Sequence, residues 1–168
     1  MKIESVYRIL FFILLPIAGF FAFIDFFAIL AALAQPALLI SVFIIACMVI
    51  YIYTTYRFST IGIQQAKPCK HSLKDLIKVN AYVSLFFIVM SFVQTYLILT
   101  QPNLIKTMMG QLLVQQQNNM PPGTTADTFV SMAKGILYFL AAFATILLVH
   151  IVITFRLLKK YNHVFDGA

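Results

Sequence analysis

Long apolar runs without charge dominate the chain. Residues 9–56 contain one charged side chain, Asp25, and residues 79–105 and 135–155 contain none. A membrane-spanning helix needs about 20 mostly apolar residues, so the first run can hold two helices and each of the others one. The apolar positions show no one-sided helical period, as expected when lipid or other helices cover every face. The pattern predicts an all-α integral membrane protein whose four transmembrane helices cover residues 8–32, 37–57, 77–99 and 129–156.

The first run must turn between its two helices, and Ala34-Gln35-Pro36 is the candidate. Proline lacks an N–H and suits the first turn of a helix. We therefore expect a tight turn at residues 33–36 and, across the whole chain, two helical hairpins in a single domain, residues 1–168. Gln101-Pro102 follows the third helix in the same way, and Leu10–Ile13 is repeated as Leu85–Ile88. A duplication of the hairpin remains open, but such short matches arise easily in an apolar sequence.

The basic residues predict the orientation. With the N-terminus in the cytoplasm, only Lys106 and Lys134 lie outside. Inside are Lys2, Arg8, Arg57, Lys67, Lys70, Lys74, Lys78, Arg156, Lys159 and Lys160. This positive-inside bias predicts a multi-pass protein of the inner (cell) membrane with both termini cytoplasmic. Most tyrosines then fall near the inner interface, where amphipathic rings are expected at headgroup level: Tyr7, Tyr51, Tyr53, Tyr56, Tyr82 and Tyr161.

The segment Ala32-Leu33-Ala34 has the small-residue pattern of a signal-peptide cleavage site. The apolar run before it is longer than the usual hydrophobic region of a signal peptide. We therefore expect this segment to be retained as the first transmembrane helix.

Composition agrees with this class. The chain is 62% hydrophobic and 10% charged, with a mean hydropathy of +0.95, whereas a soluble domain is about 25% charged. The net charge of +7 could indicate a nucleic-acid partner in a soluble protein. Here the lysines lie beside the membrane without an aromatic stacking platform, so we expect no nucleic-acid partner. The predicted partner is the lipid bilayer, with anionic headgroups against the basic face.

Two loops are long enough to matter. In the inner loop, residues 58–76, Ser72 and Asp75 form the spacing of a capping box that would open the third helix. The outer loop, residues 100–128, contains an apolar stripe that predicts a short amphipathic helix over residues 102–116. We favour a structural lid on the bundle for this helix over a partner site, although a methionine-rich stripe can serve either role.

Asp25 is the charge that topology does not explain. It lies 17 positions after Arg8, roughly 25 Å along a helix that rises 1.5 Å per residue. A carboxylate at that depth is costly unless it is paired, hydrated or protonated. We favour a structural pair with Lys134, with Gln94 at a similar depth, over a proton or cation site.

His150 is a polar residue inside the fourth helix. A lone membrane histidine usually makes an interhelical hydrogen bond, and His71 and His163 lie in the loop and the tail, so we expect no haem. Cys47 and Cys69 cannot form a disulfide framework, and one Cys-x-His pair is too few ligands for structural zinc. No cofactor or metal is therefore predicted, and the candidate intramembrane polar site consists of Asp25, Lys134, Gln94 and His150.

No catalytic motif for phosphate binding, acyl transfer or metal-dependent hydrolysis occurs in the chain. We expect a non-enzymatic protein that acts as a subunit or accessory scaffold of a larger membrane complex, with other membrane subunits or copies of itself as partners. The alternative is a small homo-oligomeric transporter or channel in which Asp25 is the proton or cation site.

Overall fold

The computed structural model describes residues 3–101, 103, 106–107, 110–111 and 126–165. These residues contain helices and no β-strand. The chain divides into two compact units: Met1–Phe87 with Thr145–Ala168, and Ile88–Ala144. Helices α3 and α5 each contribute one half to each unit.

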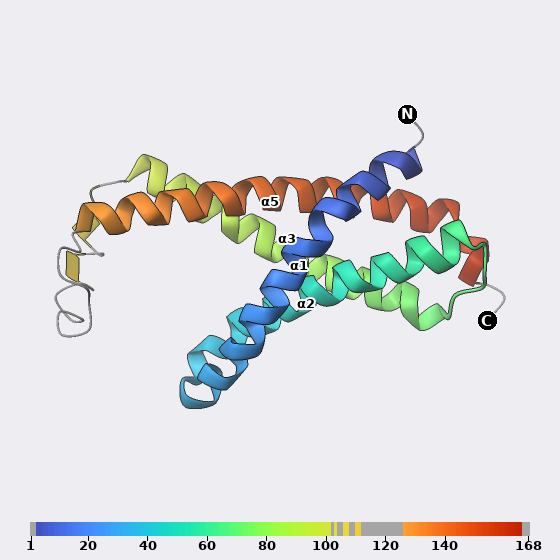
Figure 1. The fold of residues 1–168 in the computed structure, drawn as a ribbon, viewed down its shortest axis with the longest axis horizontal. Coiled ribbons are helices and arrows are strands. Elements are labelled where there is room, and N and C mark those ends of the chain that lie inside the picture. The colour runs from blue at the N-terminus through green and yellow to red at the C-terminus, as the bar shows by residue number, and fades with distance from the viewer. Residues whose placement is uncertain (1–2, 102, 104–105, 108–109, 112–125, 166–168) are drawn as a thin grey trace. The chain divides into compact units, whose positions relative to one another are not determined.

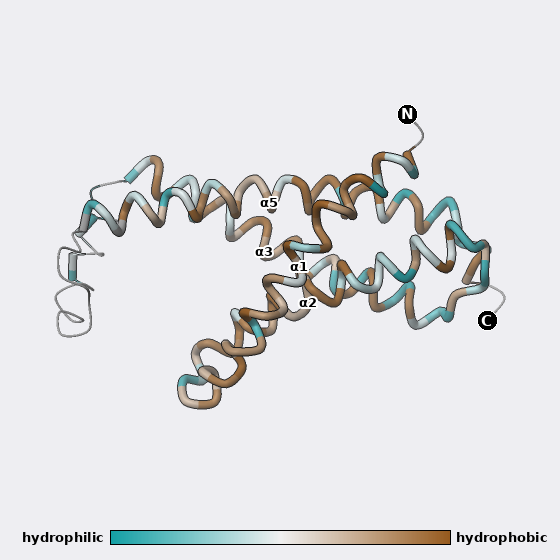
Figure 2. The backbone as a smooth tube through the Cα atoms, in the orientation of Figure 1, coloured by the Kyte–Doolittle hydropathy of each residue, from teal (hydrophilic) through white to brown (hydrophobic). Residues whose placement is uncertain are grey.

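The four predicted helices are present, and each is long and apolar enough to cross a membrane. They are α1 (Ile3–Ala34), α2 (Leu39–Arg57), α3 (His71–Thr100) and α5 (Ala126–Lys160), as Figure 1 shows. Figure 2 shows that apolar residues make up most of their length. Three of them extend beyond the predicted ends, because hydropathy locates the apolar stretch whereas a helix continues into the polar headgroup region. The protein is a multi-pass membrane protein.

The turn after α1 occurs at Gln35, as predicted. The Gln35 N–H donates to the Ala31 carbonyl at 3.0 Å, which closes the last turn of α1. Pro36 then opens the short 3-10 helix η1 (Pro36–Leu38), where its missing N–H has no cost. The chain enters α2 directly, and α1 and α2 contact each other.

The inner loop is shorter than predicted. After Arg57 the chain continues as η2, a π-helix over Phe58–Gln64, so only residues 65–70 link it to α3. Two residues after the π-helix, Ala66 adopts the left-handed region, with φ of 50°. The Lys67 N–H donates to the Ile61 carbonyl at 3.1 Å. A π-helix differs from an α-helix only in its hydrogen-bond register, and hydropathy carries no signal for that difference.

The predicted capping box at Ser72 is also wrong. Helix α3 begins at His71, one residue earlier. In a capping box, the Asp75 carboxylate would accept from the backbone N–H of Ser72. Instead its Oδ2 atom lies 3.1 Å from Nδ1 of His71, four residues earlier in the same helix. An i, i+4 pair of opposite polarity on the helix surface therefore replaces the predicted cap.

The C-terminal segment packs against this end of the first unit. The short helix η4 (Asn162–Phe165) places the Val164 carbonyl 2.9 Å from the Cys69 N–H, and the Phe165 ring stacks on Phe58 with centroids 5.5 Å apart. Gly62 makes the close approach possible, because a Cβ there would lie 3.2 Å from Cys69 Sγ and 3.3 Å from Val164 Cγ1. The sequence pattern assigned no structure to this tail.

The second unit contains the other halves of α3 and α5, residues 88–100 and 126–144. Lys106 forms an ion pair with Asp127 at the start of α5, with Nζ and Oδ1 2.7 Å apart. The predicted amphipathic helix over residues 102–116 lies mostly outside the described residues.

Candidate functional site

Four polar side chains from three helices meet inside the first unit. Tyr7 comes from α1, Tyr51 from α2, and His150 and Thr154 from α5. Each is no more than 1% exposed. We call these four residues the Tyr-His-Thr cluster. Polar groups buried this deeply in an apolar segment are costly unless they are hydrogen-bonded, so their partners decide what the cluster can do.

Tyr51 is the centre of the hydrogen-bond network. Its hydroxyl lies 2.9 Å from His150 Nδ1 and 2.9 Å from Thr154 Oγ1. The Thr154 hydroxyl in turn donates to the His150 backbone carbonyl at 2.8 Å. One assignment uses every donor in this set: Nδ1–H donates to Tyr51, Tyr51 to Thr154, and Thr154 to the His150 carbonyl. The three bonds then form a closed circuit that begins and ends at His150.

Ring packing joins α1 to the same cluster. The Tyr7 ring stacks on the His150 imidazole, with centroids 4.6 Å apart and planes 11° from parallel. The Tyr51 ring meets the imidazole edge-on at 5.6 Å, and the Tyr7 hydroxyl lies 3.4 Å from Thr154 Oγ1. Fully buried apolar side chains belong to the same three helices, namely Leu14, Met48, Ile52, Leu147 and Ile151. The cluster therefore links α1, α2 and α5 through hydrogen bonds and ring stacking, which apolar lipid tails cannot replace.

His150 thus makes the expected interhelical hydrogen bond. Its partner is Tyr51, which the sequence pattern does not identify. The prediction that the rings of Tyr7 and Tyr51 face the headgroups is wrong, because both rings are buried. Tyr53, Tyr56 and Tyr82 are exposed, and their place at the headgroup level stays a prediction. The usable signal was the i, i+4 spacing of His150 and Thr154, which places two polar groups on one face of α5.

One ring nitrogen of His150 is left over. Among the described residues, Nε2 is buried and has no hydrogen-bond partner. No group of three or more His, Cys, Asp or Glu side chains among those same residues lies close enough to hold a metal. In the described part of the chain, the cluster therefore offers one nitrogen and three hydroxyls, which suit helix packing better than metal binding.

Asp25 is buried in α1, with 5% of the residue exposed. Its Oδ1 atom has no hydrogen-bond partner among the described residues. Around it on α1 lie exposed rings of Phe20, Phe23, Phe26 and Phe27. A buried carboxyl oxygen in an apolar segment needs a donor or a proton, so Asp25 marks a contact that the first unit does not complete.

The predicted partners of Asp25 belong to the other unit. Lys134 lies in α5 and is half-buried, and Gln94 lies in α3 and is exposed. Both fall within Ile88–Ala144, whereas Asp25 and His150 belong to the first unit. The Asp25–Lys134 pair stays a prediction. Of the four predicted site residues, His150 lies in the hydrogen-bond network through its Nδ1 atom, and Asp25 Oδ1 has no partner among the described residues.

The two cysteines are separate, free and buried. Cys47 lies in α2, and Cys69 lies in the link before α3, against Gly62 and Val164. Burial raises the pKa of the Cys69 thiol, and the nearby Arg57 opposes this shift without cancelling it. Cys69 is therefore a packing residue, since a nucleophilic thiol requires a lowered pKa.

Comparison of the chain with protein-family models, with curated proteins and with solved structures found no match. A function for the protein therefore has to be inferred from its residues and from the contacts between its helices.

Proposed function

We propose that the protein is a non-enzymatic subunit or accessory scaffold of a larger assembly in the inner membrane. In this proposal the four helices form two hairpins, both termini are cytoplasmic, and the ten basic residues of that side hold the orientation. The outer loop, residues 100–128, then belongs to the opposite side of the membrane.

The observation that carries the proposal is the aromatic surface of α1. Phe23 and Phe27 are 64% and 54% exposed, and their rings touch edge to face with centroids 5.1 Å apart. Phe26 extends the set, with its ring 5.6 Å from Phe27. Aromatic residues are enriched at protein interfaces and carry much of their binding energy. A connected group of rings next to the incompletely paired Asp25 fits a helix that packs against another subunit.

Lipid is the competing occupant of this surface, and a conservative substitution distinguishes the two. Changing both Phe23 and Phe27 to Leu keeps the surface apolar, so a lipid-facing helix tolerates it. A protein partner that packs against the rings loses shape complementarity and edge contacts. The control is the double change Phe43→Leu with Phe139→Leu, at two exposed phenylalanines of α2 and α5.

The test is purification of the tagged full-length chain from its native membrane in several mild detergents, followed by mass spectrometry. We expect a partner in fixed stoichiometry with the wild type and the control. Its recovery should fall about tenfold, equivalent to about 1.4 kcal/mol, with Phe23→Leu/Phe27→Leu. Recovery of a lone monomer from every detergent contradicts the proposal.

A homo-oligomeric transporter or channel is the second candidate. It is favoured by Asp25 Oδ1, which has no hydrogen-bond partner among the described residues. A buried acidic residue in a membrane bundle is a default pathway residue. Proton or cation flux into proteoliposomes containing wild-type protein tests this. Flux that Asp25→Asn abolishes and Asp127→Asn preserves would support transport, and absence of flux, or flux unchanged by Asp25→Asn, would reject it.

A further inference from the structure

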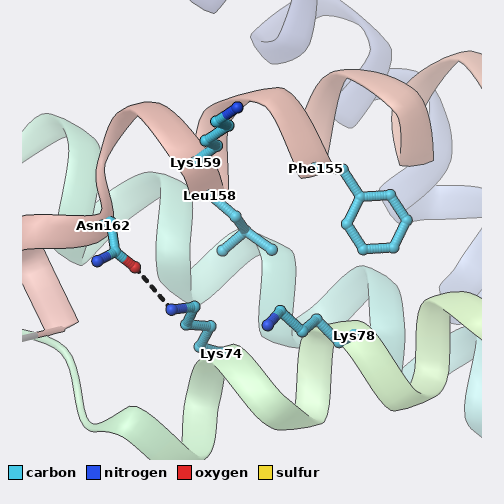
Figure 3. A pocket seen from close by; sticks show the side chains of 6 residues that line it. All are labelled: Lys74, Lys78, Phe155, Leu158, Lys159 and Asn162. Atoms are coloured by element: carbon cyan, nitrogen blue, oxygen red, sulfur yellow. Dashed lines mark hydrogen bonds between the residues drawn. The ribbon is translucent and has the colours of Figure 1, made fainter.

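A basic pocket lies where α3 begins and α5 ends, within the first unit. Its volume is about 410 Å³, and it is lined by Lys74, Lys78, Phe155, Leu158, Lys159 and Asn162. Figure 3 shows that Lys74 extends from α3 toward Asn162, that Lys78 runs along α3 toward Lys74, and that Lys159 Nζ points away from both. Lys74 is held in place, because its Nζ donates to Asn162 Oδ1 at 2.6 Å.

Among the described residues, only lysines bring charge to this pocket. No described carboxylate lines it. The two described acidic side chains at this end are engaged elsewhere, Glu4 with Lys160 at 2.6 Å and Asp75 with His71 at 3.1 Å. Two lysines four residues apart on one helix repel each other slightly, and an anion between them would remove that repulsion. The pocket is therefore built for a negatively charged ligand.

The surface next to the pocket indicates what kind of anion. Lys74, Lys78, Tyr82 and Phe86 follow one another at four-residue intervals, so they form a row of neighbours that winds by about 40° per step around α3. Tyr82 and Phe86 are exposed, and the Tyr82 ring lies 5.8 Å from the Phe155 ring of α5. From Lys78 to Phe86 the helix rises roughly 12 Å, at 1.5 Å per residue. Along this row the side chains change from cationic lysines to the amphipathic Tyr82 and then to the apolar Phe86. The distance matches a lipid headgroup and the start of its acyl chain.

We propose that this pocket binds an anionic phospholipid, with its phosphate at the ammonium groups of Lys74 and Lys78 and an acyl chain along Tyr82 and Phe86. Charge-assisted hydrogen bonds from lysine to phosphate supply the headgroup contact, and basic pockets between transmembrane helices bind such headgroups. A free phosphate offers the same charge but leaves the apolar stripe unused. The site is independent of the proposed role as a subunit and needs only the membrane-spanning helices.

The test uses the purified full-length chain and native mass spectrometry, with phosphatidylglycerol and phosphatidylcholine of identical acyl chains as probes. We expect one phosphatidylglycerol to be retained per chain, and phosphatidylcholine to be lost under the same activation. Lys74→Gln/Lys78→Gln should weaken retention by about tenfold or more, because each lysine near the surface contributes to anionic-lipid binding. Lys78→Gln alone, which leaves the Lys74–Asn162 bond intact, should also weaken it.

The matched control is Lys67→Gln/Lys70→Gln, which removes the same charge from the link before α3. We expect this variant to retain phosphatidylglycerol within about threefold of the wild type, since only the distributed attraction changes. Equal losses in both double variants would overturn the site in favour of diffuse attraction. Displacement of the lipid by millimolar inorganic phosphate would overturn the lipid assignment, and wild-type retention by Lys78→Gln would overturn the pocket.

Discussion

The ring of Tyr7 stacks on the imidazole of His150, with centroids 4.6 Å apart and planes 11° from parallel. The two residues are far apart in the sequence and belong to different helices, α1 and α5. Between transmembrane helices there is no hydrophobic driving force, because lipid tails are as apolar as the side chains. Packing and hydrogen bonds among Tyr7, Tyr51, His150 and Thr154 therefore provide specific contacts that hold these three helices together.

Removal of the Tyr51 hydroxyl should loosen the bundle. Tyr51→Phe leaves His150 Nδ1 and Thr154 Oγ1 without their shared partner, at an expected loss of about 1–2 kcal/mol in the free energy of unfolding. Equilibrium unfolding in mixed micelles measures this. The control is Tyr53→Phe, at an exposed position two residues away on α2, and equal losses in both variants would show that the buried network does not stabilise the bundle.

Two glycines should respond oppositely to the same change. A Cβ at Gly62 would lie 3.1–3.3 Å from three buried side chains, whereas at Gly19 nothing lies within 4 Å. Gly19→Ala should stabilise the protein by about 0.5–1 kcal/mol through helix propensity. Gly62→Ala should destabilise it by about 1–2 kcal/mol through overpacking against Cys69 and Val164. If both variants gain stability in the same unfolding assay, the tail does not pack on η2 as described.

The Cys69 thiol should react slowly at neutral pH. Burial raises its pKa, so less thiolate is present at a given pH than in a free cysteine, and the midpoint of the rate profile should lie above the ordinary pKa of about 8.5. The measurement is the alkylation rate of Cys69 against pH in a Cys47→Ala background. Val164→Ala should increase the rate by opening the packing around the thiol. A rate midpoint below the ordinary value would contradict the buried environment.

The predicted pair of Asp25 and Lys134 can be tested by a double-mutant cycle. If the two side chains interact, Asp25→Asn and Lys134→Gln should be non-additive by roughly 0.6–1.7 kcal/mol in the free energy of unfolding. The same cycle with Lys106→Gln should be additive, because Lys106 is paired with Asp127. Additivity in both cycles would remove Lys134 as the partner of Asp25.

How much of this could be read from the sequence depends on whether a feature is local. The four spans and the turn at Gln35 follow from charge-free runs and one proline, which act within a few residues. The roles of Tyr51 and Tyr53 could not be read in this way: they lie on the same helix, but one is buried and the other exposed. In a helix that is apolar on every side, only the neighbouring helices distinguish the two faces.

The packing of the C-terminal tail shows the same limit. The approach of Val164 to Gly62 joins the tail to a helix about a hundred positions earlier, and no local pattern announces such a contact. The basic pocket likewise combines lysines of α3 and α5. In the sequence these lysines are visible only as part of the net positive charge. His150 was recognisable as a polar residue in a span, but its partners became visible only in three dimensions.

The most direct test of the proposed role compares purification of the wild type, Phe23→Leu/Phe27→Leu and Phe43→Leu/Phe139→Leu from the native membrane. We expect a stoichiometric protein partner with the wild type and the control. With the α1 variant, recovery of the partner should fall about tenfold while the amount of the protein itself is unchanged. Equal recovery of the partner with all three proteins, or no partner with any of them, would contradict assembly through the phenylalanine surface of α1.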